Sequence, residues 1–213
     1  MPSSVTSSTL TSSTLRAGAL CGVLAGLLIA LPGLVEAFTG ETSATSVPLA
    51  LAPAFALPLL TALHRRQGPA TGRLGTSAAT VNLIGLGLFG GAAFASNLVL
   101  FYLDEDIIDE TLTGPTVPAL IGSAAVFAVG SALFGAAMIR ARVFPRVPSW
   151  GYAVVVPLFA FLTALPDSPL TSALHVLVGG ILIWLSAALW RTVPDVEHTT
   201  DPNRVTGIHH VGT

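Results

Sequence analysis

The feature that most constrains this chain is a stretch of 28 residues, 76–103, that contains no charged side chain. A helix needs about 20 predominantly apolar residues to cross the hydrocarbon core of a bilayer, so this stretch is long enough to span a membrane. Directly after it come five of the 11 acidic residues of the protein, which are Asp104, Glu105, Asp106, Asp109 and Glu110. The sequence therefore predicts a membrane helix that ends at a strongly negative surface.

The composition extends this prediction to the whole chain. Of 213 residues, 52% are hydrophobic and only 9% are charged, which is too few charges to cover the surface of a soluble domain. We therefore expect the lipid bilayer as the main partner and no nucleic acid. The single cysteine, Cys21, leaves no second thiol for an intrachain disulfide.

Six apolar runs predict an all-α, polytopic membrane protein built as a bundle of six transmembrane helices. The runs cover residues 17–38, 47–63, 76–103, 117–139, 150–165 and 170–190. The predicted organisation is a disordered N-terminal tail over 1–15, a transmembrane domain over 16–191, and a disordered cytoplasmic tail over 192–213, since both tails are polar and aperiodic.

The charged loops predict the orientation. If the six runs cross the membrane alternately, all nine arginines fall on one side, and the opposite side receives Glu41, the acidic residues at 104–110 and Asp167. Cytoplasmic loops of membrane proteins carry an excess of basic residues, so both termini are predicted to be cytoplasmic.

Small residues at four-residue spacing predict how the helices pack, because membrane helices associate where their backbones approach closely. Such stripes occur in the first, third and fourth runs, and the simplest interpretation is a tight core of these three helices. A homo-oligomer that forms through one of the stripes is the alternative. The stripes are Gly18, Gly22 and Gly26; Gly87, Gly91 and Ala95; and Ala128, Ala132 and Ala136.

Four polar residues within the apolar runs are candidates for function, because polar groups inside a membrane are costly. Glu36 and His175 lie toward the outer ends of the first and sixth runs and are candidate catalytic residues, as a proton donor and acceptor. Asn97 and Asn82 are candidate ligand-binding residues. The alternatives are that Glu36 reaches water, that His175 bonds to a neighbouring helix, and that the asparagines bridge helices.

The acidic residues after the third run allow two interpretations. Asp106 and Asp109 superficially resemble the aspartate-rich motif with which isoprenoid enzymes hold magnesium against diphosphate, and only in that case is a cofactor, Mg²⁺, expected. Otherwise we expect neither cofactor nor metal. The alternative is a break at Leu103, with Asp104 as the N-cap of a short surface helix that ends at Gly114.

Two arginine-rich segments carry a resemblance. They are LHRRQ at 63–67 followed by GRLG at 72–75, and AMIRARVFPR at 137–146. From residue 17 to 191 the chain is similar to a diffuse group of small, uncharacterised six-helix proteins of the bacterial inner membrane. The resemblance implies location in the bacterial cytoplasmic membrane, and it implies no activity, substrate or catalytic residue.

The functional hypothesis is an integral membrane protein that binds a small or lipid-like ligand in its outer half. The first alternative is a membrane-embedded cyclase or isomerase of isoprenoid-like lipids, and the second is a small transporter or channel component. Convergence of Glu36, Asn97 and His175 in one apolar pocket would favour an enzyme. A through-path lined also by Pro58 and Pro157, which interrupt the second and fifth runs, would favour transport.

Overall fold

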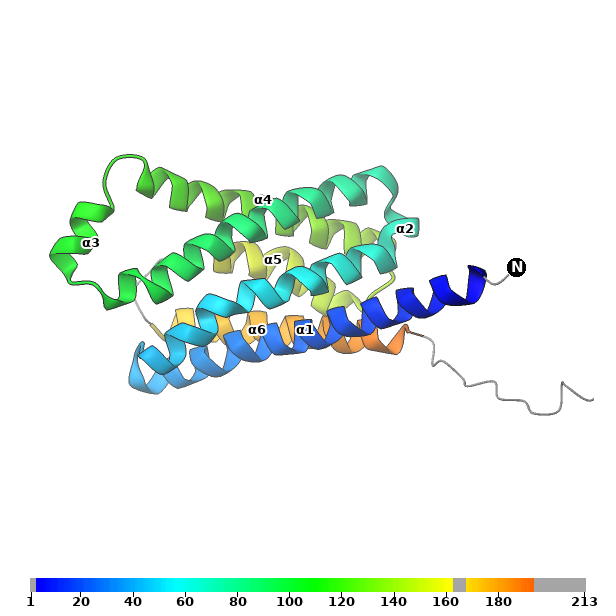
Figure 1. Cartoon of the computed structure of the whole chain (residues 1–213), viewed down its shortest axis with the longest axis horizontal. Coiled ribbons are helices and arrows are strands. Elements are labelled where there is room, and N and C mark those ends of the chain that lie inside the picture. The colour runs from blue at the N-terminus through cyan, green and yellow to red at the C-terminus, as the bar shows by residue number, and fades with distance from the viewer. Residues whose placement is uncertain (1–2, 163–167, 194–213) are drawn as a thin grey trace, which may run out of the picture.

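The computed structural model describes residues 3–162 and 168–193, and in this part of the chain it consists of helices joined by short turns, with no strand. All helices except α3 lie side by side along one axis (Figure 1). In chain order the elements are α1 (Ser3–Thr39), α2 (Ser43–Leu98), the 3₁₀ turn η1 (Leu100–Tyr102), α3 (Glu105–Thr111), α4 (Thr116–Ala141), α5 (Arg146–Leu162) and α6 (Pro169–Arg191).

Helix α2 is folded back on itself. Its helical geometry is broken at Gly72, which has φ 57° and ψ −148°, a conformation that favours glycine because it has no Cβ. Figure 1 shows the two arms of α2 running in opposite directions from this point. The arm before Gly72 contains the second apolar run of the sequence, and the arm after it contains the third.

Four elements among the described residues are long and apolar enough to cross a membrane, which supports a membrane protein. They are Ser12–Thr39, Ser43–Tyr102, Thr116–Ala141 and Pro169–Arg191. The second of these contains both arms of α2. Helix α5 is also apolar but has only 17 residues, a length of roughly 26 Å at 1.5 Å per residue.

Helix α1 begins at Ser3, so in the structure it includes residues 3–15, for which the sequence predicted a disordered tail. Starting a helix costs more than extending one, and the apolar part of α1 already supplies the nucleus from which the helix continues toward the N-terminus. At the other end of the chain, α6 ends at Arg191. The predicted C-terminal tail lies outside the described residues from position 194 onward, and so does Asp167.

The predicted core of the first, third and fourth helices is found only in part. The third run does pack against α4, but α1 packs instead against α6 and the first arm of α2. Gly18 lies against Pro58 and Ala62 of that arm, and Gly26 lies against Gly179 of α6. The stripe in α1 is therefore a contact face, but with other partners than those predicted. The remaining contacts join α2 to α4, α4 to α5 and α5 to α6.

Helix α4 and the second arm of α2 meet through glycines outside the predicted stripes. A Cβ added to Gly85 would lie 2.5 Å from Cα of Phe127, and one added to Gly130 would lie 2.5 Å from Cα of Asn82. By contrast, Gly87 and Gly91 have open space where a Cβ would be, so their stripe faces away from α4. A homo-oligomer through that stripe stays a prediction.

The acidic segment forms the short surface helix that the sequence analysis gave as an alternative. After η1, Leu103 is extended, Asp104 is the N-cap of α3, and Gly114 adopts a positive φ of 57° before α4 begins. Glu105 and Asp106 occupy the first turn of α3, where the helix dipole favours negative charge. The break relieves the unfavourable placement of carboxylates at the C-terminal end of the preceding helix.

Candidate functional site

A cavity of about 510 Å³ lies between the helices. Its walls come from α1, both arms of α2, α4, α5 and α6, and most of its lining is aliphatic or aromatic. The polar residues that line it are Glu36, Glu41, Ser96, Asn97, Tyr152 and His175. A largely apolar cavity of this size with a few polar groups has the properties of a ligand-binding site.

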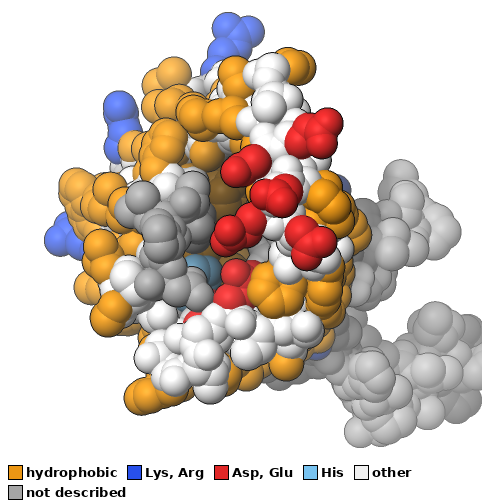
Figure 2. All heavy atoms as spheres, turned by 90° about the vertical axis from the view of Figure 1, so that its left-hand side faces the viewer, with side chains coloured by type: hydrophobic (Ala, Val, Ile, Leu, Met, Phe, Trp, Pro, Cys, Tyr) orange, Lys and Arg blue, Asp and Glu red, His pale blue; other side chains and the backbone are white. Residues whose placement is uncertain are grey.

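The cavity is elongated along the bundle. On the first arm of α2 its lining runs from Leu49 to Leu63, a distance of roughly 20 Å along a helix. Glu36 and Glu41 lie at one end, close to the connection between α1 and α2. Figure 2, which views the end of the molecule that carries α3, shows acidic side chains gathered beside a hollow in this face.

Glu36 and His175 are brought to neighbouring positions by the packing of α1 against α6. Gly33 lies directly against Cβ of His175, so the absence of a side chain at position 33 makes room for the histidine. Glu36 follows Gly33 by three residues and therefore lies one turn farther along the same face of α1. The residue is only 8% exposed, so its side chain is largely buried among the helices, where it also lines the cavity.

The hydrogen bond of His175 defines the roles of its two ring nitrogens. Nδ1 lies 2.8 Å from the carbonyl oxygen of Thr171, one turn earlier in α6. A carbonyl oxygen can only accept, so Nδ1 carries the proton that is donated in this bond. In the neutral imidazole, Nε2 is then the basic nitrogen.

Aromatic rings connect His175 to the far wall of the cavity. The His175 ring meets Phe159 of α5 edge-on, with centroids 4.9 Å apart. Phe159 lies 6.3 Å from Phe89 of α2, and Phe89 stacks on Phe127 of α4 at 4.8 Å. These four residues all line the cavity, so aromatic rings from four different helical segments border it.

Tyr152 is a cavity residue that the sequence analysis missed. Its hydroxyl oxygen accepts a hydrogen bond of 2.8 Å from Nδ2 of Asn82, which is fully buried. Asn82 thus bridges α2 and α5, as one interpretation of the sequence expected. The sequence did contain a signal for it, which is a tyrosine near the arginine-rich end of an apolar run. A tyrosine hydroxyl needs a hydrogen-bond partner when it is buried.

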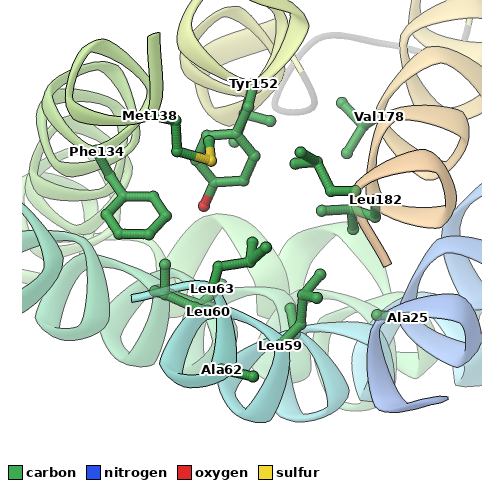
Figure 3. Packing of buried hydrophobic residues seen from close by; sticks show 14 of the residues in the cluster. Ala25, Leu59, Leu60, Ala62, Leu63, Phe134, Met138, Tyr152, Val178 and Leu182 are labelled. Carbon is green, nitrogen blue, oxygen red and sulfur yellow. The ribbon is translucent and has the colours of Figure 1, made fainter. Parts of the chain in front are cut away.

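A packed layer of buried side chains lies at the end of the cavity away from α3. Figure 3 shows Tyr152 close to Phe134 and Met138 of α4 and to Leu60 and Leu63 of α2. Phe134, Met138 and Leu63 are completely buried, and the Phe134 and Tyr152 rings meet edge-on at 5.9 Å. Pro58 and Pro157 are not among the described residues that line the cavity, so the lining differs from the through-path that the sequence analysis associated with transport.

Of the candidate site residues, Glu36, Asn97 and His175 all line the cavity, while Asn82 lies behind Tyr152. The Asn97 side chain donates to the carbonyl oxygen of Ala93 in its own helix at 2.9 Å, and does not bridge helices through this bond.

Asp106 and Asp109 lie apart from these candidates. Both are exposed on α3 and neither lines the cavity. Within residues 3–162 and 168–193 no group of three His, Cys, Asp or Glu side chains is placed to hold a metal ion. A role for magnesium at the acidic segment therefore stays a prediction.

Fold and cavity together define a helical protein with several membrane-length apolar helices around an apolar chamber. Comparisons with models of protein families, with curated proteins and with solved structures found no match. The resemblance to small six-helix bacterial membrane proteins accordingly stays a prediction.

Proposed function

We propose that this protein is a six-span protein of the bacterial cytoplasmic membrane that binds an elongated, lipid-like ligand in its central cavity. The observation that carries the proposal is the convergence of Glu36, Asn97 and His175, from three segments far apart in the sequence, on one apolar chamber of about 510 Å³. Polar groups within a membrane bundle are costly, and their gathering around a cavity favours a binding role over a purely structural one.

The distribution of charge supports the membrane orientation. The described arginines all lie away from α3. They occur at residue 16 within α1, at 65–73 around the fold of α2, at 140–146 where α4 ends and α5 begins, and at 191, where α6 ends. The acidic residues of α3, together with Glu36 and Glu41, belong to the other end. With arginines facing the cytoplasm, the polar end of the cavity lies in the outer half of the membrane.

The shape of the cavity supports an elongated ligand with a polar end. The six polar lining residues include Glu36, Glu41 and Asn97 near the α3 end, and the long wall toward Leu63 is mainly aliphatic and aromatic. An apolar chain that leaves lipid for this cavity exchanges one apolar environment for another, so its affinity depends on close packing and on the polar groups that hold its end.

Filling the cavity tests this proposal. The full-length protein is purified in detergent, immobilised through a C-terminal tag and incubated with tritiated farnesol as a neutral, elongated probe. We expect saturable binding that falls at least tenfold in Ala56→Phe and in Ala93→Phe, because both alanines line the cavity. Two positions are used so that one variant that fails to fold leaves the other to decide.

The matched control is Ala136→Phe, which adds the same ring to an exposed position of α4 outside the lining. It is expected to bind the probe like the wild type. Two outcomes would contradict a ligand site in this chamber. One is an equal loss of farnesol binding in Ala136→Phe and in the cavity variants, and the other is farnesol binding by the wild type no stronger than by the cavity variants.

The second candidate function is acid and base catalysis on an isoprenoid-like lipid, as a cyclase or isomerase. It is favoured by the neighbouring positions of Glu36 and His175 and by the bond that leaves Nε2 as the basic nitrogen of His175. Lipid extracts from cells that express the wild type are compared with extracts from cells that express Glu36→Gln/His175→Ala. Identical products would exclude this candidate and leave the binding role.

A further inference from the structure

We infer that the ligand of the cavity is a lipophilic cation, such as an amine or quaternary onium group carried on an apolar body. The inference rests on the proposed binding function and adds the chemical class of the ligand. It is carried by the charged residues of the cavity lining. Those among the described residues are acidic, whereas the whole molecule has nearly equal numbers of acidic and basic residues.

The charged side chains of the lining are all acidic. Glu36 and Glu41 line the cavity, and no arginine is found among the described residues that do so. The whole protein, by comparison, has nine basic and 11 acidic residues and a net charge of only −2. The arginines lie at the opposite helix ends, so the cavity has a negative character that the overall composition does not reveal.

The other titratable groups of the lining do not cancel this charge. His175 carries at most one positive charge, against two carboxyl groups, and Tyr152 carries none when protonated. Glu41 accepts a hydrogen bond of 3.0 Å from the hydroxyl of Ser46, which holds this carboxyl group in place at the cavity. An anionic head group would meet repulsion here, whereas a cation would gain attraction that the low dielectric of a membrane interior strengthens.

The aromatic wall also suits a cation with an apolar body. Phe89, Phe127 and Phe159 present a continuous group of rings to the cavity. The negative face of an aromatic ring attracts cations, and the ring surface also packs against apolar groups. A volume of about 510 Å³ is far larger than a simple metal ion needs, so the cation is expected to be a bulky organic one.

Two probes of nearly equal size and opposite charge test the inference. Labelled tetraphenylphosphonium and tetraphenylborate are each titrated onto the immobilised full-length protein, and the signal of Ala56→Phe is subtracted as the background of a filled cavity. We expect saturable binding of the phosphonium at least tenfold tighter than that of the borate. We also expect Glu36→Gln, which keeps the shape of the side chain and removes its charge, to weaken phosphonium binding about tenfold.

The matched control is Glu110→Gln, which removes a carboxylate from the same end of the molecule but outside the cavity lining. We expect it to change the dissociation constant less than twofold, because an exposed charge is screened by water and salt. A similar loss in Glu110→Gln and Glu36→Gln would overturn the inference, because the attraction would then come from the surface.

The farnesol measurement separates this inference from the proposed function. If farnesol binds and the two ions bind equally, or the borate binds more tightly, the cation preference is overturned and the binding site remains. If neither ion nor farnesol binds above the cavity-filled background, the binding function and the inference built on it are both overturned.

Discussion

Gly33 of α1 lies directly against Cβ of His175 in α6, and this contact sets the distance between the two helices that supply Glu36 and His175. A methyl group at position 33 would occupy the space that the histidine now fills. The position of both candidate residues therefore depends on a glycine that does not itself touch a ligand.

Gly33→Ala is expected to lower the free energy of unfolding by about 1–3 kcal/mol, because overpacking of a tight contact forces the helices apart. Thermal unfolding in detergent measures the change. The control is Gly87→Ala, also in a helix but with open space for the methyl group, which is expected to be neutral or slightly stabilising. Equal stability of the two variants would show that the contact between α1 and α6 is looser than the structure indicates.

Tyr152→Phe is expected to destabilise the protein by about 1–3 kcal/mol, because it leaves the buried Nδ2 of Asn82 without its acceptor. A double-mutant cycle with Asn82→Leu is expected to give a coupling of about 0.6–1.7 kcal/mol, the range for hydrogen bonds between membrane helices. Tyr102→Phe serves as the control, since Tyr102 is 54% exposed. Additive effects of the two substitutions would mean that the bond contributes nothing.

The N-caps of α3 and α6 are expected to differ in strength. Ser168 accepts a hydrogen bond from the Thr171 backbone at 3.3 Å, so Ser168→Ala is expected to cost about 1 kcal/mol. Asp104 makes no such bond to α3, and Asp104→Ala is expected to change stability by less than about 0.5 kcal/mol. Chemical unfolding of both variants measures the difference, and a larger loss in Asp104→Ala would contradict the capping geometry.

The proposed orientation predicts the outcome of reporter fusions. Alkaline phosphatase is expected to be active when fused after Gly114, on the side of the acidic α3, and inactive when fused after Gly68 or Thr192. The reason is that arginine-rich segments are retained in the cytoplasm. A fluorescent protein at the same three positions should give the reverse pattern. Activity of the phosphatase at Thr192 would place the C-terminus outside and contradict the six-span topology.

The structure confirms the predicted break at Leu103. The break could be predicted because its cause lies in the residues next to it in the sequence. Carboxylates oppose the dipole at a C-terminal helix end, and starting a new helix at Asp104 places Glu105 and Asp106 in a first turn, where the dipole favours them. The fold of α2 at Gly72 is also a local feature, because it lies between the second and third apolar runs, which are distinct in the sequence. Features of this kind depend on neighbours along the chain and can be predicted from it.

The contact faces could not be predicted in the same way. Gly85 and Gly87 lie two residues apart in one helix, and either could have marked the face that meets α4. Lipid and helix surfaces are equally apolar, so hydrophobic periodicity does not distinguish them, and the choice depends on which neighbouring backbone fits. The stripe at Gly87 and Gly91 was the more regular pattern, yet Gly85 is the residue that Phe127 contacts.

The sequence by itself determined the helical class, the apolar runs, the separation of arginines from carboxylates, and Glu36 and His175 as candidates. Only the tertiary structure decided that α1 packs on α6, that Tyr152 meets Asn82, and that Glu36, Asn97 and His175 border one cavity. The physical reason is the range of the forces involved. Helix formation and membrane insertion are governed by local composition, whereas a cavity arises from the shapes of several helices that meet far apart in the chain.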